Sequence, residues 1–433
     1  MTGPADEFAV VAPSPANAGG ADQIGVRLYN ERLILSLARR FGQLSKIEVA
    51  RMTGLSVQST STIMNRLQAD GLLKREAPLR GRVGQPTVPA SLDPEGAFSI
   101  GLKIGRRSCD LVLVDFCGGV RRRAHRAHPY PTPDGVMEFV GDELAPLVAS
   151  LAPQQRHRIA GLGVAAPFQL WSWSAEIGAP ADKMDAWRSF SIEEELARVS
   201  PVGVTSCNDA TSACAAEFFF GEGWRHRDFL YFFLGAFVGG GLVLDGALYP
   251  GRTGNAAAVG SMPIAAPSGG DPASSQLIAR ASLYQLERRI RAAGRDPSSM
   301  WRTPGAWDDF SPLLDEWIDD AANALAYAAV AAMSVIDVEA IVIDGAMPPD
   351  VRERLRLRVA AQIEVLDRRG LSEATIVAGS IGAEARAIGG AALPLIKAFA
   401  RDRELVFKDP PGESKRAASP PARRPAPIAS SGP

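Results

Sequence analysis

The segment Phe232–Gly246, FFLGAFVGGGLVLDG, decides the interpretation of the fold. It predicts an apolar strand, a glycine-rich turn, a second apolar strand and a closing turn at Asp245. Residues 98–116 repeat this strand–turn–strand pattern in FSIGLKIG and CDLVLVDF. Strands alternating with helices follow each pair, so the sequence predicts two similar α/β halves that face one another across a cleft. Glycine-rich turns between strands often cradle phosphates with backbone N–H groups, so nucleotide binding is the first hypothesis to examine.

The composition is ordinary for a globular protein, but the charge is unevenly distributed. The 433 residues are 46% hydrophobic and 22% charged, with a formal net charge of −1. Residues 27–90 contain 11 Arg or Lys and 4 Asp or Glu, a net of +7, so the rest of the chain sums to −8. A basic segment attached to an acidic body is typical of a module that binds a polyanion. A chance cluster of solvated charges is the alternative.

The cysteines and the apolar segments exclude several other classes of protein. The four Cys residues have no paired spacing and the four His residues do not cluster with them, so we expect no disulfide framework and no metal site. The N-terminus lacks a basic start followed by a long apolar run, and the most apolar segment, AANALAYAAVAAMSVI, is too short for a membrane span. The sequence predicts a cytoplasmic protein with no membrane partner.

Residues 28–92 predict three helices followed by a β-hairpin. A helix in LYNERLILSLARRFG precedes a short helix that begins after Ser45 and ends at Gly54. The third helix has Ser56 as its N-cap and Gly71 just beyond its C-terminus. A short helix, a glycine-containing turn and a second helix form the helix-turn-helix arrangement. The following LLKREAPLRGRVGQPTVPASL predicts a two-stranded wing with a basic tip.

The order of motifs along residues 28–402 resembles the ROK family of repressors, open reading frames and kinases, in its winged-helix repressor branch. The N-terminal matches are GLSVQSTSTIMNRLQADGLL and GRVGQP. The C-terminal matches are GLGVAAP, CNDATSACAAE, GGGLVLDGALYPG, IDVEAIVIDGAMP and AIGGAALPL. The resemblance implies an α/β chain with an N-terminal winged helix-turn-helix and a C-terminal, two-lobed domain of the actin/hexokinase type. In the kinases of this family that domain transfers phosphate from ATP to a sugar.

The resemblance and the composition together divide the chain into four segments. Residues 1–22 are rich in Pro, Ala and Gly and are expected to be disordered. We expect the winged helix-turn-helix domain at 23–93 and the kinase-like effector and oligomerisation domain at 94–403. A disordered Pro/Arg-rich tail completes the chain at 404–433; it is either a solvated tail or one that touches DNA through its arginines.

The motifs that serve the kinases are altered in this chain. The family's D-x-G-G-T turn reads Lys103-Ile-Gly-Arg-Arg107, which replaces a carboxylate by a cation. In the glycine-rich turn Phe237 stands where glycine lets backbone N–H groups close on phosphate. The sugar-binding G-E-x-G-H pattern has Ala258 and Ser261 at the Glu and His positions, and APSGGDPASSQLIARAS replaces a cysteine-rich zinc motif. We therefore expect no catalytic residue, no cofactor and no metal, so the chain is not expected to be an enzyme.

The motif CNDA survives and is the centre of the predicted effector site. Its Asn208 and Asp209 resemble the family pair whose Asp is the general base of the kinases and a ligand to sugar hydroxyls in the regulators. A carboxylate accepts hydroxyl protons and an amide both donates and accepts, which suits a polyol. The alternative is that Asp209 is only the N-cap of the helix that begins there. With Gly254 and Asn255 these two residues form the predicted effector site.

The favoured hypothesis is a transcriptional repressor whose kinase-like domain senses a sugar or another small molecule. The third helix would read base edges in the major groove through Gln58, Ser59, Ser61 and Thr62, and Val57 would contact a thymine methyl group. Asn65 and Arg66 would lie nearer the DNA backbone. In the wing, Arg80 and Arg82 would contact phosphates or enter a narrow minor groove. One such helix reads few base pairs, so we expect a homodimer or tetramer on near-palindromic double-stranded DNA. The alternatives are an active sugar kinase with an accessory DNA-binding domain, and a regulator whose cleft is empty.

Overall fold

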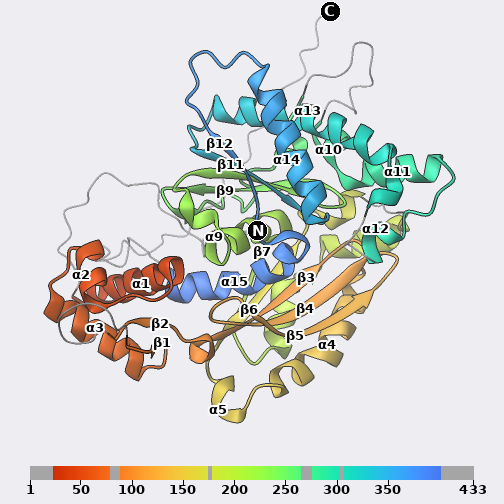
Figure 1. The fold of residues 1–433 in the computed structure, drawn as a ribbon. Helices are drawn as coiled ribbons and strands as arrows, with labels where there is room; N and C mark the ends of the chain where they lie inside the picture. Colours follow the sequence, from red (N-terminus) through yellow and green to blue (C-terminus); the bar gives the residue numbers. More distant parts are fainter. Residues whose placement is uncertain (1–22, 79–87, 174–177, 265–275, 303–306, 401–433) are drawn as a thin grey trace, which may run out of the picture.

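The computed structural model describes residues 23–78, 88–173, 178–264, 276–302 and 307–400. Two β-sheets lie one above the other with helices between them, and a small helical domain packs at one side (Figure 1). The α/β architecture with a winged helix-turn-helix and a two-lobed domain is therefore confirmed.

The N-terminal domain contains three helices and a two-stranded antiparallel sheet, as predicted. Its elements are α1 (Gln23–Phe41), α2 (Lys46–Thr53), α3 (Val57–Ala69), β1 (Leu73–Arg75) and β2 (Ala90–Leu92). The side chains of Ser45 and Ser56 cap α2 and α3 by accepting hydrogen bonds from backbone N–H groups of the first turn. Gly54 ends α2 with φ of 74°, a conformation that costs glycine little. The tip of the predicted wing lies outside the described residues.

The first lobe is a five-stranded mixed sheet with the strand order β5-β4-β3-β6-β7. Its strands are β3 (Phe98–Ile104), β4 (Ser108–Asp115), β5 (Val120–Ala127), β6 (Ile159–Ala166) and β7 (Val204–Asn208). Strands β3, β4 and β5 are antiparallel neighbours, whereas β3, β6 and β7 run parallel. Helices α4 (Pro133–Ala149) and α8 (Ile192–Val199) cover one face and bury the apolar side chains of β3, β4 and β6.

The second lobe repeats this topology, with the strand order β10-β9-β8-β11-β12. Its strands are β8 (Phe229–Leu234), β9 (Val238–Leu244), β10 (Ala247–Leu248), β11 (Ala340–Gly345) and β12 (Thr375–Ala378). The outer side carries α10 (Ile278–Ala281), α11 (Leu283–Ala292), α12 (Ser299–Arg302), α13 (Leu313–Met333) and α14 (Pro349–Glu364). The repeated strand–turn–strand pattern thus belongs to two lobes with the same strand order, as the sequence predicts.

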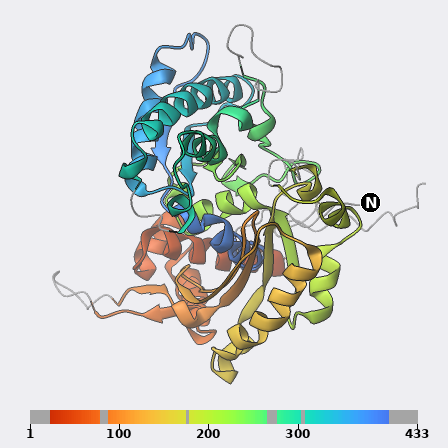
Figure 2. The same ribbon diagram turned by 90° about the vertical axis from the view of Figure 1, so that its right-hand side faces the viewer.

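Helices α9 (Asp209–Phe219) and α15 (Ala385–Phe399) pack against each other between the two sheets. A Cβ atom on Gly389 would lie 1.8 Å from the Ser212 carbonyl oxygen, and one on Gly163 would lie 1.9 Å from the Gly390 carbonyl oxygen. Glycine at these positions therefore permits the close approach of α15 to α9 and to β6. Figure 2 shows α15, in blue, between the two lobes and next to the red and orange N-terminal domain.

Strand β5 is absent from the sequence-based prediction, which places a helix directly after β4. Its sequence, VRRRAHRA, has four of eight residues charged and most of its side chains are exposed. An edge strand pairs on one side only, and charged side chains protect its free edge from further pairing. Apolar alternation, the signal used to find strands, is therefore weak in this segment.

Candidate functional site

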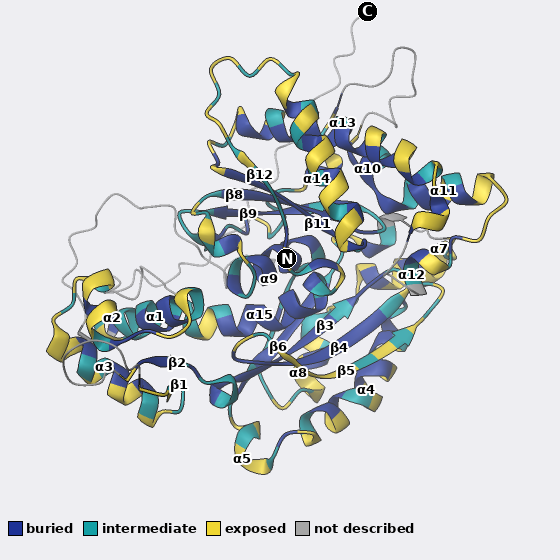
Figure 3. Ribbon diagram, viewed as in Figure 1, coloured by how far each residue is buried: buried dark blue, intermediate teal, exposed yellow. Residues whose placement is uncertain are grey.

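The outward face of α3 presents polar side chains to solvent. Met64 and Leu67 are buried against the rest of the domain, so the opposite stripe carries Gln58, Thr62 and Asn65, which are exposed (Figure 3). With about 3.6 residues per turn, these three positions lie above one another along the helix. The Thr62 hydroxyl donates to the Gln58 carbonyl oxygen at 3.1 Å. The stripe is accessible from solvent.

The residues that flank this stripe have partners within the protein. Lys46 of α2 donates to the Ser61 hydroxyl at 3.0 Å and to the Asn65 side-chain oxygen at 2.8 Å. The Ser59 hydroxyl accepts a hydrogen bond from Ser56 at 2.9 Å, and Arg66 lies 3.6 Å from Glu31. Lys46 is therefore a cation beside this stripe of α3, and the sequence analysis gives Lys46 no role.

The remaining predicted DNA contacts differ in how far the structure describes them. Val57, at the start of α3, is 56% exposed and is therefore accessible from solvent. Arg80 and Arg82 fall outside the described residues. The contacts of all nine residues with DNA stay predictions.

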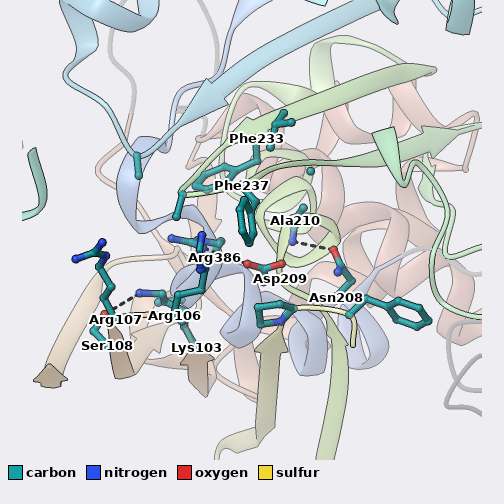
Figure 4. Close-up of a pocket in the computed structure, with 18 of the residues that line it drawn as sticks. Lys103, Arg106, Arg107, Ser108, Asn208, Asp209, Ala210, Phe233, Phe237 and Arg386 are labelled. Carbon is teal, nitrogen blue, oxygen red and sulfur yellow. Dashed lines mark hydrogen bonds and ion pairs between the residues drawn. The ribbon is translucent and has the colours of Figure 1, made fainter. Parts of the chain in front are cut away.

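A cleft of about 690 Å³ lies between the two lobes. It is bordered by the β3–β4 turn, the start of α9, the β8–β9 turn and the start of α15 (Figure 4). Three of the four predicted effector residues, Asn208, Asp209 and Asn255, line it. Gly254, with φ of 73°, is in the neighbouring turn and is not among the lining residues of the described chain. The volume is within the range of small-molecule sites.

Two adjacent side chains at the start of α9, Asn208 and Asp209, have different roles. Asn208 is the N-cap, because its side-chain oxygen accepts hydrogen bonds from the backbone N–H groups of Ala210 and Thr211 at 3.0 and 3.3 Å. The alternative that Asp209 caps the helix is therefore wrong. The Asp209 carboxylate instead lies 3.1 Å from the Arg386 guanidinium of α15, and it faces the cleft in Figure 4. Asp209 is thus held in place by charge and remains accessible from the cleft.

A second group of charges lies on the first lobe at the floor of the cleft. Lys103 Nζ donates to Asp110 at 2.8 Å and to Ser108 at 3.0 Å, and His125 Nδ1 lies 2.8 Å from the other Asp110 oxygen. Burial alone would raise the pKa of Asp110, but the Lys103 ammonium and the hydrogen bonds from Lys103 and His125 outweigh burial and lower this pKa to about 2. Burial first, and then the charge of Arg386, lower the pKa of Lys103. Asp110 is therefore ionised at neutral pH.

The two hairpin turns, one from each lobe, are joined across the cleft. The Arg106 guanidinium of the β3–β4 turn lies over the Phe237 ring of the β8–β9 turn, 3.8 Å from its centroid. Arg107 Nη2 reaches the buried Glu287 of α11 at 2.5 Å. The β8–β9 turn is therefore covered on its cleft side by Phe237 and Arg106, whereas the three glycines predicted to form the turn, Gly239, Gly240 and Gly241, lie within β9.

Comparison with known proteins identifies the family. A model of the ROK family matches residues 99–396, and a model of the MarR family matches residues 32–82. The first match covers more than half of the chain. The chain belongs to the ROK family.

Individual ROK relatives match over different shares of their length. The protein y4fQ of Sinorhizobium fredii is 27% identical over 379 residues, which are 86% of this chain and 91% of that protein. The xylose repressor of Bacillus spizizenii is 22% identical over 244 residues, 56% of this chain and 62% of the repressor. The crystal structure of a ROK family transcriptional regulator, a homologue of the Escherichia coli MLC protein, aligns with a TM-score of 0.59 at 18% identity and covers 87% of this chain and 97% of its own. This last match shows that the two chains share a fold.

The positions that the sequence analysis interprets as departures from the kinase motifs lie together at the cleft. Lys103, Arg106 and Phe237 all line it, and so do Ala258 and Ser261, which stand where sugar-binding Glu and His side chains are expected. Most of the segment that replaces the zinc motif lies outside the described residues. Within the described part of the chain, no cluster of three or more His, Cys, Asp or Glu side chains is arranged to hold a metal. No helix there is long and apolar enough to cross a membrane.

Arg386 is one of the charged cleft residues to which the sequence analysis gives no role. It is separated from Asp209 by 177 positions, and no spacing rule connects the two. Lys103, Arg106 and Arg107 appear in the sequence analysis only as departures from a kinase motif. Their accumulation of positive charge in KIGRR is a signal that could have placed cations at the cleft.

Proposed function

We propose that this chain is a DNA-binding transcriptional regulator, acting as a repressor, whose kinase-like domain senses a small carbohydrate without transferring phosphate. The observation that carries the proposal is the presence, in one chain, of an exposed polar stripe on α3 and a cleft lined by Asn208 and Asp209 together with Lys103, Arg106 and Phe237 at the turns where kinases would handle phosphate. Relatives described as a xylose repressor and a ROK family transcriptional regulator support it.

The DNA-binding part of the proposal places α3 in the major groove. Gln58 carries an amide group that can form paired hydrogen bonds with adenine, and Thr62 lies one turn further along α3. Asn65, whose side-chain oxygen accepts from Lys46, would lie nearer the DNA backbone. Lys46 and the wing arginines Arg80 and Arg82 would neutralise phosphates beside the groove. One helix reads too few base pairs for genomic specificity, so the active form would be a symmetric dimer on a near-palindromic operator.

The sensing part of the proposal uses the paired side chains at the start of α9. Asp209 accepts hydrogen bonds from sugar hydroxyls, while the Asn208 amide N–H₂ group can donate, because its oxygen is used by the helix cap. The cleft lies between two lobes, so a ligand that contacts both lobes favours one degree of closure over another.

Two helices connect the cleft with the DNA-binding domain. Both α9 and α15 begin at the cleft and end at aromatic side chains, Phe219 and Phe399, on the side of α1. The Phe399 ring packs edge-on against Phe116, 4.8 Å between centroids, and Arg39 of α1 lies 4.0 Å from the Phe219 centroid. Since a helix is stiff over this length, a shift at the cleft would reach α1 through both helices.

An active kinase is the second candidate, and Asp209 is the feature that favours it. Phosphoryl transfer depends on positioning and charge stabilisation at the nucleotide. Phe237 and Arg106 occupy the turn where backbone N–H groups would otherwise approach phosphate. ATP turnover in the purified chain with a panel of sugars, abolished by Asp209→Asn, would establish the kinase instead.

Fluorescence anisotropy on DNA from just upstream of the gene, at several salt concentrations, tests the regulator directly. The wild type is expected to bind one upstream segment more tightly than scrambled DNA of equal length, with strong salt dependence. Gln58→Ala should reduce that preference by about 1–3 kcal/mol, whereas Gln154→Ala, the same change at an exposed position of the first lobe, should leave it unchanged. Equal binding of all DNA sequences by the wild type would refute the proposal.

A further inference from the structure

The charged side chains that line the cleft are predominantly basic. Among the described lining residues, the five cations outnumber the three carboxylates, which gives a net charge of +2 before the histidines are considered. The cations are Lys103, Arg106, Arg107, Arg123 and Arg386, and the carboxylates are Asp110, Asp209 and Glu384. A site for a neutral sugar needs no such excess, because hydroxyl groups are bound equally well by uncharged amides and by carboxylates.

Two of these cations come from different elements and face the same space. Lys103 projects from β3 and is 14% exposed in its side chain, and Arg386 projects from the first turn of α15 and is 16% exposed (Figure 4). Each has one carboxylate partner, Asp110 and Asp209 respectively. Arg386 Nε is buried and has no hydrogen-bond partner among the described residues. The charge of Arg386 also contributes to lowering the pKa of Lys103, after burial, so the two cations are close enough to repel each other.

The backbone adds positive potential at the same place. Helices α9 and α15 both begin at the cleft; the Asn208 side chain caps α9, and the 3-10 turn Gly382–Glu384 runs directly into α15, where Ala385 N–H donates to the Gly382 carbonyl oxygen. The helix dipoles place partial positive charge at both helix starts. An anion between the two cations would therefore reduce their mutual repulsion and gain hydrogen bonds from Arg386.

We propose that the effector is an anionic carbohydrate, with its carboxylate or phosphate group between Lys103 and Arg386 and its hydroxyl groups on Asn208 and Asp209. This inference rests on the proposed role of the cleft as the sensor site. The anion competes with Asp209 for Arg386, so binding acts directly on the first turn of α15, the helix that reaches the DNA-binding domain. A nucleotide is the less favoured anion, because Phe237 and Arg106 cover the glycine-rich turn.

Isothermal titration of the full-length chain at constant ionic strength tests the charge preference. The probes are matched pairs of neutral and anionic carbohydrates: glucose with glucose 6-phosphate, ribose with ribose 5-phosphate, galactose with galacturonate, and glucose with gluconate, together with orthophosphate and adenosine monophosphate. At least one anionic member should bind about tenfold or more tightly than its neutral partner. The phosphate and carboxylate arms distinguish the two sources of the anion.

Variants then locate the anion. Arg386→Gln should weaken binding of the preferred anionic probe roughly tenfold more than it weakens binding of the neutral partner, because glutamine loses the charge but can still donate a hydrogen bond to Asp209. Lys103→Gln should act in the same direction and provides a second test if one of the two variants does not fold. Arg198→Gln removes an exposed arginine from α8, on the outer face of the first lobe, and should change nothing.

Several results would overturn the inference. These are equal binding of neutral and anionic partners, binding of no carbohydrate at millimolar concentration, tighter binding of adenosine monophosphate than of every sugar, and an unchanged affinity in both cleft variants. Operator binding measured on the same preparation without ligand distinguishes failure of the anionic-effector inference from failure of the proposed DNA-binding function. Sequence-specific DNA binding together with no preference for anionic carbohydrates rejects the inference alone, whereas the absence of sequence-specific DNA binding rejects the proposed function.

Discussion

Replacement of Arg39 by methionine should loosen the DNA-binding domain from the rest of the protein. Arg39 Nη1 donates to the Phe116 carbonyl oxygen at 2.7 Å, and its guanidinium lies 4.0 Å from the Phe219 ring centroid and 4.8 Å from that of Phe116. Burial lowers the pKa of Arg39 to about 10, so the group is still charged at neutral pH. The side chain therefore joins α1 to the ends of β4 and α9 as a cation.

The size of the effect follows from these contacts. A hydrogen bond from a charged donor contributes about 1.5–3 kcal/mol, and a cation–π contact contributes about 0.5–2 kcal/mol. Methionine keeps much of the apolar packing, so we expect the free energy of separating α1 from the ends of β4 and α9 to fall by about 2–3 kcal/mol. Because about 1.4 kcal/mol corresponds to a factor of ten, local opening should become roughly 30- to 150-fold more frequent.

Hydrogen exchange followed by mass spectrometry measures this opening. Amides of α1 and of residues 115–119 should exchange faster by that factor in Arg39→Met, while amides of β8 and β11 in the second lobe keep their protection. Arg358→Met is the matched control, since Arg358 is half-exposed on α14 and pairs with the exposed Asp319. Unchanged exchange at α1, or equal acceleration in both lobes, would refute the assignment of Arg39 to the junction.

Three further predictions concern DNA reading, acid stability and helix packing. Gln58→Ala should weaken operator binding by about 1–3 kcal/mol and relax specificity at one base pair, measured with operators substituted one position at a time. The pKa of Asp110 is about 2 instead of its ordinary 3.8. Its ionised carboxylate therefore adds about 2 kcal/mol to the free energy of unfolding above pH 3.8, and this contribution is lost as the pH falls toward 2. In Asp110→Asn the free energy of unfolding, measured by urea titration at each pH, should fall less steeply over this acid range. Gly389→Ala should lower the free energy of unfolding by about 1–3 kcal/mol, because its Cβ meets the Ser212 carbonyl oxygen at 1.8 Å. Gly141→Ala, on α4 with nothing within 4 Å, should be neutral or slightly stabilising.

Each of these predictions has an outcome that contradicts it. A uniform loss of affinity for all DNA sequences would place Gln58 on the backbone. The same acid limb in the wild type and in Asp110→Asn would mean that Lys103 does not hold the folded-state pKa down. Equal stability of the two glycine variants would show that α15 can move away from α9 without cost.

Local signals account for the parts of the fold that the sequence predicts well. Ser45, Gly54 and Ser56 act through hydrogen bonds and dihedral preferences within a few residues, so the helix boundaries of the DNA-binding domain are predictable. The two strand–turn–strand pairs are predictable because their apolar runs and glycine turns are also local. Strand β5 is missed because its arginines hide the alternation of an edge strand.

The candidate site depends on contacts that no local pattern contains. Asn208 and Asp209 are adjacent and either can cap a helix, so only the geometry separates the cap from the side chain that faces the cleft. The pairing of Arg386 with Asp209 and the stacking of Arg106 on Phe237 each join distant segments. The sequence therefore predicts where the cleft lies and that Lys103 stands there in place of a carboxylate, but not which carboxylates the cleft cations pair with.

The central claim is that one chain both reads DNA and releases it in response to a ligand in the cleft. The most direct test is fluorescence anisotropy of the full-length protein on its upstream DNA, titrated with the carbohydrate that binds most tightly in calorimetry. A coupling of roughly 1–3 kcal/mol predicts that saturating ligand weakens operator binding about 5- to 150-fold, and that Asp209→Ala abolishes the response while ligand-free DNA affinity is retained. An operator affinity that is the same with and without bound ligand would contradict the account.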